Sequence, residues 1–459
     1  MITLKDKRVL VMGLGRFGGG IGVTQFLVSQ GAIVRVTDQL NQTQLHTSLK
    51  ALKNLPIDFV LGQHRIQDFQ NWAEIVVVNP AVKPQANKYL EAAEKNNVKL
   101  TTEIQILLQR LPNPQQTVAI TGTNGKSTTL AMLGHILQKC LKKDAKVWLG
   151  GNIGGSLLTK LSQIKQKDIV VLELSSFMLE RLRNTAWAPA IAVITNIAPN
   201  HTDWHGSHQA YLHAKQVILN KQIPNNAAFL GPGAENFITQ DFVIKGIMQS
   251  KPKTIDIPIP GPHNQQNAHM ALAVCQQLKI DITQARQALK TFNGLPHRMQ
   301  RIGQHQNVQY FNDSKATTPQ AAILAIQGFQ KGKVHAILGG YDKGTDLSKL
   351  AKCAAKHCKA IYTIGQTAQK ITQAIQTIQT NPTNQPNPTN PAAQINPTAQ
   401  NLNPTVLTSH HLDTAMHQIQ KNTQPNDIVL LSPGCASWGQ FENFEKRGQA
   451  FTTLFKNLT

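Results

Sequence analysis

Short runs of β-branched and aliphatic residues alternate along this chain with amphipathic stretches of helical length, and the alternation comes in three successive series. A strand followed by a crossover helix and another strand is the repeating unit of parallel α/β sheets. A chain of 459 residues is also too long for one ordinary core. The sequence therefore predicts three tandem α/β domains, with strands at 7–13, 32–38 and 74–79, then at 117–122, 146–151, 168–175 and 189–196, and finally at 308–314, 334–340, 360–365 and 427–434.

The first strand runs into a glycine-rich turn, G-x-G-x-x-G, made by Gly13, Gly15 and Gly18. Glycines at this place allow a tight turn and a close approach of the backbone to a pyrophosphate. Asp38 ends the next strand and can accept hydrogen bonds from a ribose or a base. The motif suits a redox dinucleotide, a flavin or any nucleoside diphosphate equally well, and such a turn can also bind nothing.

A second phosphate signal, "TGTNGKSTT", follows the strand at 117–122. Backbone N–H groups from Gly122 through Thr123, Asn124 and Gly125 to Lys126 are expected to surround phosphate oxygens, with the Lys126 ammonium neutralising their charge. Ser127 or Thr128 can hold Mg²⁺. Ile120 stands where the usual loop has its first glycine, which predicts a shifted loop geometry.

Metal ligands are expected at the ends of the neighbouring strands. Glu173 ends the apolar run "IVVLE", and "NHTDWHG" places His201, Asp203 and His205 after the following strand. Because Mg²⁺ prefers oxygen ligands, a histidine here would be an accessory ligand. We expect this His-Asp-His cluster to face the phosphate loop.

Composition excludes several classes of protein. The net charge is +22, yet lysines and arginines are dispersed and aromatic residues are only 5%, which disfavours nucleic-acid binding. Apolar runs stay far below the ~20 residues of a membrane span, and the N-terminus lacks a signal-peptide pattern. Five scattered cysteines without a CxxC pair favour a reducing cytoplasm. Residues 380–405 are low-complexity Pro/Asn/Thr sequence, which predicts an exposed, mobile insertion without a function.

Nine segments occur in an order that resembles the Mur ligases over essentially the whole chain outside 380–405. They read "GTNGKST", "GGNIG", "LELSSFMLE", "NHTDWHG…HAK", "GPHNQQNA", "GLPHRMQ", "FNDSKATTP", "GGYDKGTDL" and "LSPGCASWGQFENFEKRG". "LELSSFMLE" and "SPGCASWGQF" favour the members that add D-glutamate. In this family the departure at Ile120 is normal.

The resemblance implies an N-terminal Rossmann-like domain that binds a UDP-linked substrate (1–104), a central P-loop ATPase-like domain (105–295) and a C-terminal Rossmann-like domain that brings the amino acid and closes on the others (296–459). It implies ATP, two Mg²⁺ ions, UDP-N-acetylmuramoyl-L-alanine and D-glutamate as ligands, without nucleic acid or membrane insertion. The reaction that the resemblance implies passes through an acyl phosphate and belongs to peptidoglycan precursor synthesis in the cytoplasm. A monomer is expected.

Residue roles are implied by the same resemblance. Lys126 grips phosphate, Ser127 and Glu173 bind the first metal, and His201 binds the second. Lys215, in "YLHAKQ", is expected as a carbamate that binds metal. The remaining roles concern ligands: Asn267, Arg298 and Asp313 contact ATP, Asn152 contacts the muramoyl substrate, Thr317, Lys343, Ser437 and Phe444 form the D-glutamate pocket, and Lys315 faces the active site from the closing domain.

Three residues depart from the family pattern. Asn200 replaces the acid that often precedes the metal-binding histidine, Gly439 replaces another acid, and Gln39 stands where threonine is common. These departures leave the reaction class intact and concern fine contacts. The alternatives are another amino-acid-adding Mur ligase or a folylpolyglutamate synthase-like ligase, and, more remotely, an NAD-dependent dehydrogenase or a basic nucleic-acid-binding ATPase.

Overall fold

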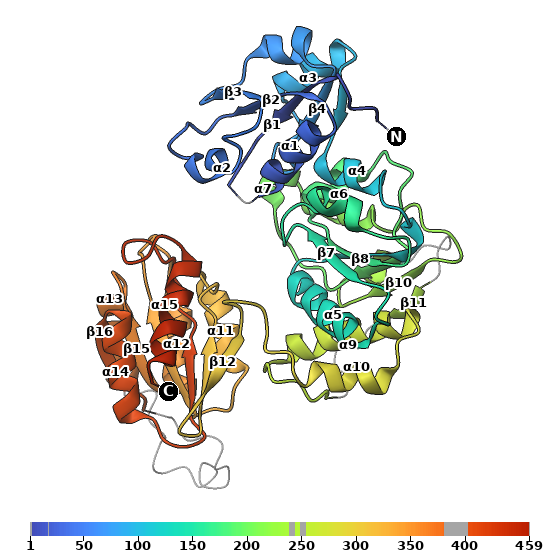
Figure 1. Ribbon diagram of the computed structural model, residues 1–459. Coiled ribbons are helices and arrows are strands. Elements are labelled where there is room, and N and C mark those ends of the chain that lie inside the picture. Colours follow the sequence, from blue (N-terminus) through green and yellow to red (C-terminus); the bar gives the residue numbers. More distant parts are fainter. Residues whose placement is uncertain (1, 17, 238–243, 248–253, 381–402, 459) are drawn as a thin grey trace. The chain divides into compact units, whose positions relative to one another are not determined.

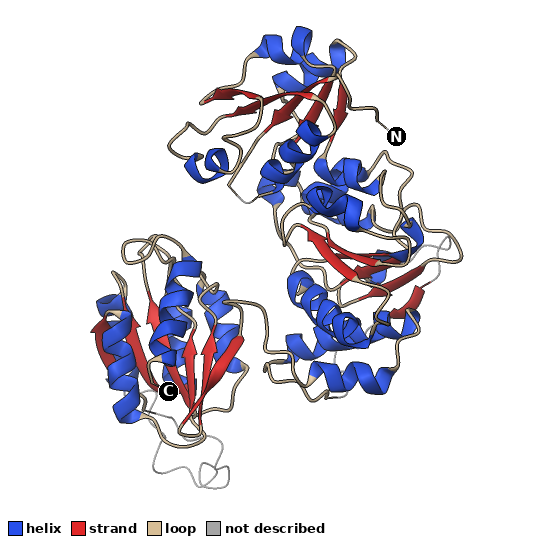
Figure 2. Cartoon of the chain, viewed as in Figure 1, coloured by secondary structure: helices blue, strands red, loops and turns tan. Residues whose placement is uncertain are grey.

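The computed structural model describes residues 2–16, 18–237, 244–247, 254–380 and 403–458. Most of the described residues belong to three separate sheets and the helices that cover them (Figures 1 and 2). Two compact units hold these sheets: residues 1–253 with 266–288 contain the first two, and residues 254–265 with 289–459 contain the third. The predicted α/β fold is confirmed, while the domain boundaries at 104/105 and 295/296 stay predictions.

The first sheet is wholly parallel, with the strand order β3-β2-β1-β4-β5. Its chain order changes direction beside β1, so the turn after β1 opens at the carboxyl edge of the sheet, where α/β proteins bind ligands. Its strands are β1 (Arg8–Met12), β2 (Ile33–Asp38), β3 (Ile57–Leu61), β4 (Ile75–Val78) and β5 (Lys99–Thr101), and its helices are α1 (Gly19–Ser29), α2 (His46–Lys50), α3 (Lys88–Lys95) and α4 (Glu103–Leu108), with a π-helical turn η1 (Asp68–Trp72).

The second sheet is also parallel, with the order β11-β10-β9-β6-β8-β7. Its central strand β6 carries the phosphate loop at its carboxyl end. The strands are β6 (Thr117–Thr121), β7 (Val147–Gly151), β8 (Ile169–Glu173), β9 (Ile191–Ile194), β10 (Ala227–Leu230) and β11 (Ile244–Ile247). The helices are α5 (Lys126–Cys140), α6 (Ser176–Leu182), α7 (Thr202–His205), α8 (His208–Gln216), α9 (Pro262–Gln277) and α10 (Ile282–Leu289), with short 3₁₀ turns η2 (Pro114–Gln116), η3 (Leu157–Gln163) and η4 (Glu235–Phe237).

The third sheet differs from a wholly parallel design. Its order is β12-β13-β17-β14-β15-β16, and the edge strand β12 runs antiparallel to β13. The strands are β12 (Gln300–His305), β13 (Val308–Asn312), β14 (Val334–Gly339), β15 (Cys358–Ile364), β16 (Thr405–His410) and β17 (Ile428–Leu431). The helices are α11 (Pro319–Gln327), α12 (Ser348–His357), α13 (Ala368–Thr380), α14 (Leu412–Asn422) and α15 (Phe444–Lys456). The predicted insertion therefore follows α13 and precedes β16, and its residues 381–402 lie outside the described part of the chain.

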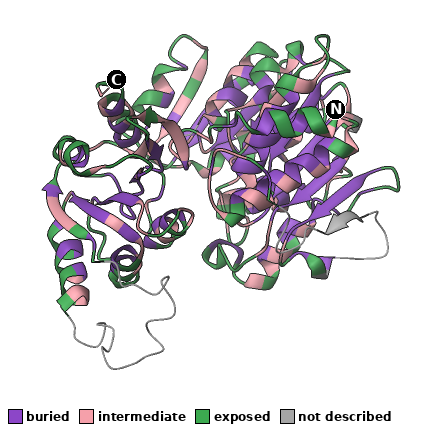
Figure 3. Cartoon of the chain, turned by 90° about the horizontal axis from the view of Figure 1, so that it is seen from below, coloured by how far each residue is buried: buried purple, intermediate pink, exposed green. Residues whose placement is uncertain are grey.

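Figure 3 colours most of the strands, and parts of the helices, as buried residues. One hydrophobic cluster continues from the first sheet to the second, because α1 packs on η3 through Val23, Phe26 and Leu27 on one side and Leu157 and Leu158 on the other. This shared core joins the first two sheets into one compact unit. In the third sheet, separate clusters cover the two faces.

Candidate active site

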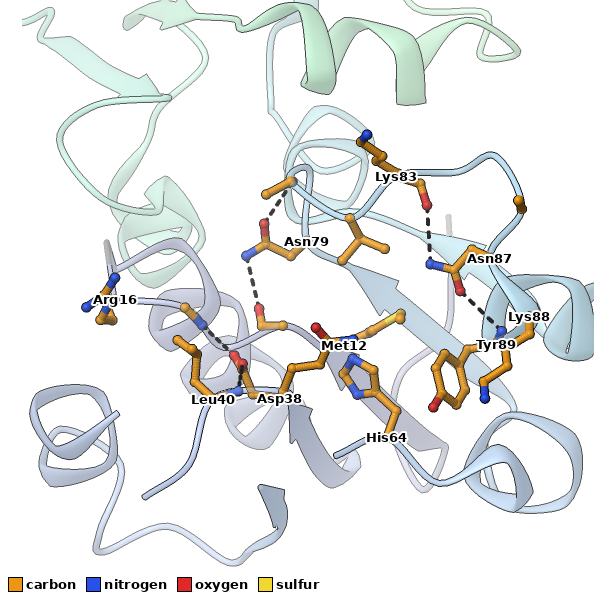
Figure 4. A pocket seen from close by; sticks show the side chains of 16 residues that line it. Met12, Arg16, Asp38, Leu40, His64, Asn79, Lys83, Asn87, Lys88 and Tyr89 are labelled. Atoms are coloured by element: carbon orange, nitrogen blue, oxygen red, sulfur yellow. Dashed lines mark hydrogen bonds between the residues drawn. The ribbon is translucent and has the colours of Figure 1, made fainter. Parts of the chain in front are cut away.

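The turn after β1 borders a cavity of about 760 Å³ in the first α/β layer. Gly13, Gly15 and Asp38 line it, and Figure 4 shows Asp38 together with other residues of the lining. The Asp38 carboxylate accepts hydrogen bonds from the backbone N–H groups of Gly15 (3.0 Å) and Leu40 (2.8 Å), so it fixes the turn as well as facing the cavity. Gly18 lies at the N-cap of α1 in a left-handed conformation and is not part of this lining.

Several lining residues were missed by the sequence reasoning. Asn79 follows β4, donates to the Gly13 carbonyl (3.0 Å) and faces the turn (Figure 4). The signal was present, because a polar residue at the carboxyl end of a parallel strand follows the same rule that selected Asp38. The other polar lining side chains are Arg16, Gln39, His64, Lys83, Asn87, Lys88 and Tyr89.

A second cavity, of about 300 Å³, connects this turn with the second sheet. It is lined by Gly13, Gly15 and Asn79 from the first sheet and by Asn152 and Phe177 from the second. The Asn152 amide donates to Glu173 Oε1 (2.9 Å), and the Asn152 backbone N–H donates to the Glu173 carbonyl (2.8 Å). Asn152 therefore connects the lining of this cavity with the Glu173 carboxylate.

The phosphate loop joins β6 to α5 with the expected geometry at its two glycines. Gly122 has a φ of +144°, and a Cβ there would lie 2.0 Å from Thr195 Oγ1. Gly125 is the N-cap of α5 with a φ of +80°, and a Cβ there would lie 2.4 Å from Asn267 Oδ1. Both positions therefore require glycine. Asn267, from α9, lies against the loop, and its contact with ATP stays a prediction.

The loop surrounds less of a phosphate than the sequence suggested. The N–H groups of Thr123 and Asn124 donate to the Asn196 carbonyl (2.9 Å) and to Asn196 Oδ1 (3.0 Å), so those two donors are engaged within the protein. The Lys126 ammonium donates to the carbonyls of Gly122 and Thr123, both at 2.9 Å. The N-terminus of α5 has first-turn N–H groups without intrahelical partners, a geometry that can bind an anion. Ser127 and Thr128 are buried in that turn.

Glu173 has the chemistry of a cation ligand. The side chain is 1% exposed, Oε1 is bonded to Asn152, and Oε2 is buried without a hydrogen-bond partner among the described residues. An unpaired buried carboxylate oxygen is costly unless a cation or donor compensates it. The residue therefore fits a site for a hard cation such as Mg²⁺.

Lys215 lies on α8 and is only 2% exposed. Its ammonium donates to the Gly122 carbonyl (2.8 Å) and to Thr121 Oγ1 (3.2 Å), at the base of the phosphate loop. Burial lowers the pKa of Lys215 well below 10.5, and the nearby Lys126 charge lowers it further, while Glu173 opposes the shift. Lys215 is therefore not a surface lysine that reaches solvent. Its environment favours the neutral amine over the ammonium.

The expected His-Asp-His cluster does not form a three-ligand metal group among the described residues, and the role of His201 stays a prediction. Across the described ranges, no group of three His, Cys, Asp or Glu residues converges so as to hold a metal. The three residues lie within one turn, α7, where positions two apart do not face each other. His201 is the N-cap with a φ of +51° and packs 4.9 Å from the Phe177 ring, whereas buried His205 contacts Ser176 Oγ (2.9 Å). Burial and the Lys126 and Lys215 charges lower the pKa of His201, against the effect of Asp203.

Residues expected on the C-terminal domain lie at the carboxyl edge of the third sheet, within their own unit. Asp313 is buried and accepts from the Met299 N–H (3.0 Å) and Ser432 Oγ (2.8 Å), and burial raises its pKa to about 7, with nearby Arg298 opposing the shift. Both carboxylate oxygens therefore already have partners in this unit.

The expected D-glutamate residues occur here in two groups. The Lys315 ammonium lies 4.9 Å from the Phe444 ring, and Thr317 donates its N–H to the Lys315 carbonyl (2.8 Å). The Lys343 ammonium lies 4.3 Å from the ring of exposed Trp438, which follows buried Ser437.

Arg447, which the sequence reasoning missed, connects the two loops that carry these groups. Its side chain is 1% exposed, and it donates to Ser314 Oγ (3.0 Å), the Ser314 carbonyl (2.8 Å) and the Cys435 carbonyl (3.1 Å). Burial lowers the pKa of Arg447 to about 10. The helix period of "NFEKRG" was the available signal, because it places this arginine on the buried face of α15.

Comparison with known proteins agrees with this arrangement. Family models match residues 7–102 (Mur ligase MurD-like, N-terminal domain), 120–242 (Mur ligase middle domain) and 297–435 (Mur ligase, glutamate ligase domain). A UDP-N-acetylmuramoylalanine--D-glutamate ligase from Roseiflexus is 34% identical over 500 residues, with all of both chains covered. The Enterococcus faecalis protein of that name is 32% identical, covering 99% of this chain and 98% of its own.

A solved structure shows the same fold. The UDP-N-acetylmuramate-alanine ligase of Thermotoga maritima aligns with a TM-score of 0.57 at 18% identity, covering 99% of this chain and 100% of its own. This protein belongs to the Mur ligase family. It is an enzyme of the ligase class. Among the helices that the structure describes, none has the length and apolar character required to cross a membrane.

Proposed function

We propose that this chain joins the amine of D-glutamate to the carboxyl group of UDP-N-acetylmuramoyl-L-alanine, with ATP as the phosphoryl donor, in peptidoglycan precursor synthesis. The observation that carries the proposal is the path from the glycine turn to Asn152, whose amide is bonded to Glu173 beside the phosphate loop. A UDP group held in the 760 Å³ cavity would extend its muramoyl arm along that path toward ATP. The glycine turn then serves a nucleoside diphosphate substrate rather than a redox dinucleotide.

The chemistry has two steps. The substrate carboxylate attacks the γ-phosphorus of ATP, which breaks the bond to the β,γ-bridging oxygen and gives an acyl phosphate and ADP. The D-glutamate amine then attacks the acyl carbon, loses a proton, and expels inorganic phosphate through a tetrahedral intermediate. Phosphorylation is needed because an ionised carboxylate has a poor leaving group. Lys126 and the N-terminus of α5 would hold the transferred phosphoryl group and offset its charge.

Glu173, Ser127, His201 and a carbamylated Lys215 are proposed to hold two Mg²⁺ ions, which would supply further neutralisation of the phosphate charge. The unpartnered Glu173 Oε2 and the buried Lys215 amine support this assignment. Asn267, Arg298 and Asp313 are proposed for ATP, with Lys315 facing the site. Thr317, Lys343, Ser437 and Phe444 are proposed for the two carboxylates and chain of D-glutamate. A cytoplasmic monomer remains our expectation.

The test is phosphate release from ATP in the presence of UDP-N-acetylmuramoyl-L-alanine, with amino acids supplied one at a time. D-glutamate should support release, and L-glutamate is the matched control. Turnover with L-alanine, L-lysine or meso-diaminopimelate, but not with D-glutamate, would overturn the substrate assignment and leave the ligase class intact.

A further inference from the structure

The loop that follows β4, residues 79–83, borders both cavities and is bonded to the segment that carries His201. Asn79 and Ala81 line both cavities, and Lys83 lines the larger one. Three hydrogen bonds connect this loop with α6 and α7 of the second sheet. We refer to residues 81–83 with Arg181, Asp203 and Trp204 as the interlayer clamp.

The clamp bonds run in both directions. Arg181 Nη2 donates to the Val82 carbonyl (2.9 Å), and Trp204 Nε1 donates to the Ala81 carbonyl (3.2 Å). In return, Lys83 Nζ donates to the Asp203 carbonyl (2.7 Å). Each bond has a cationic or indole donor and a backbone acceptor, so the loop backbone cannot shift without breaking at least one of them.

The clamp continues to His201 through ring contacts. The Trp204 ring lies 4.6 Å from Phe177, and Phe177 lies 4.9 Å from His201. Trp204 is 7% exposed. The backbone N–H groups of Trp204 and His205 both donate to the His201 carbonyl. The position of His201 therefore depends on the short helix α7, and α7 is held by the loop that lines the substrate cavity.

We propose that the interlayer clamp links binding in the glycine-turn cavity to binding at the phosphate loop, with Trp204 as the positioning residue. This inference rests on the proposed function for the identity of the two ligands. A substrate that orders residues 79–83 would fix α7 and so place His201 in advance for the nucleotide and its cation. Linkage requires the reverse effect to have the same size.

The experiment compares the affinity of the full-length protein for UDP-N-acetylmuramoyl-L-alanine with and without saturating Mg²⁺ and a non-hydrolysable ATP analogue. Calorimetry gives both dissociation constants without turnover. Wild-type protein should bind the UDP substrate at least about fivefold more tightly when the nucleotide is present, the lower end of usual coupling. Trp204→Phe keeps the ring and removes the donor, so the ratio should fall toward one while each ligand alone binds within about threefold of wild type.

Trp187→Phe is the matched control, because Trp187 Nε1 is buried without a hydrogen-bond partner in the described structure and the change removes no bond. Arg181→Met, which removes the bond to the Val82 carbonyl at a residue that lines neither cavity, provides the same test if Trp204→Phe does not fold. If Trp204→Phe or its substitute keeps the same affinity ratio as wild type, the clamp is overturned and the proposed function is not. The same holds if wild type binds both ligands but its affinity for the UDP substrate does not change with the nucleotide. Failure of wild type to bind the UDP substrate would overturn both the clamp and the proposed function.

Discussion

Substituting Gly122 should damage nucleotide binding more than a change at a positive-φ glycine whose added Cβ meets no neighbour. An alanine Cβ at Gly122 would lie 2.0 Å from Thr195 Oγ1 and 3.1 Å from the Asn196 nitrogen. Normal contact begins near 3.4 Å, so the loop or strand β9 must move by 3.4 − 2.0, about 1.4 Å. A displacement of about 1 Å at a reacting group can reduce the rate on the order of 100-fold.

The matched control is Gly62→Ala. Gly62 also has a positive φ, +79°, but nothing lies within 4 Å of an added Cβ. Both variants should lose about 1–3 kcal/mol of stability from the backbone conformation alone. Only Gly122→Ala should also raise the dissociation constant for an ATP analogue and lower turnover by about 100-fold.

Thermal unfolding and calorimetric titration with the analogue separate the two effects. Thr195→Ala removes the nearest obstacle, so the double variant should recover part of the nucleotide affinity, although it also loses the Thr195 bond to the Thr121 carbonyl. If Gly122→Ala binds and turns over like Gly62→Ala, the steric argument for the phosphate loop is incorrect.

Three further predictions concern buried charges. Lys215→Met should lose at least about 100-fold in activity and regain part of it with short-chain carboxylic acids, and ¹³C-bicarbonate should give a carbamate signal in wild type that the variant lacks; an equal signal in both would remove Lys215 from this role. Glu173→Gln keeps a partner for Asn152 but removes the charge, so the Mg²⁺ concentration for half-maximal turnover should rise by about 10–100-fold, and an unchanged Mg²⁺ titration would contradict the assignment. For Asp313, a folded-state pKa of about 7 against an ordinary 3.8 means that the folded protein binds more protons than the unfolded chain between those values, so stability is favoured below them and declines as the pH rises through about 7. Urea unfolding at pH 5 and pH 8 should show wild type losing up to about 3 kcal/mol that Asp313→Asn does not lose, and parallel pH profiles would refute the burial argument.

The sequence predicted most of the strands that lie in sheet interiors, because their apolar runs are continuous, but it missed the interior strand β10. It did not predict β12, whose residues Arg301, Gly303 and Gln304 give no alternating pattern at an antiparallel edge. The edge strand β5 has only three residues, too few for any period to be visible. Short polar edge strands are therefore recognised from their pairing with neighbouring strands, and composition alone does not predict them.

The site was predictable where one residue type at a strand end determines its role. Glu173 and Asp38 were found for that reason, and Asn79 could have been. The burial of Lys215 could not be predicted from residue spacing. The hydrophobic pattern of α8 does not determine whether this lysine points into the protein or toward solvent. The different partners of His201 and His205, the Phe177 ring and Ser176 Oγ, likewise depend on tertiary contacts that a short spacing in sequence does not show.

The acceptors of the interlayer clamp are all main-chain carbonyls, at Ala81, Val82 and Asp203. Every amino acid supplies such an oxygen, so the side chains at these three positions can drift during evolution without removing an acceptor. The donors Lys83, Arg181 and Trp204 have no such freedom. Substitutions should thus be tolerated much better at the three acceptor positions than at the three donor positions. An arginine or lysine in place of Trp204 would preserve a donor, whereas phenylalanine or leucine would not.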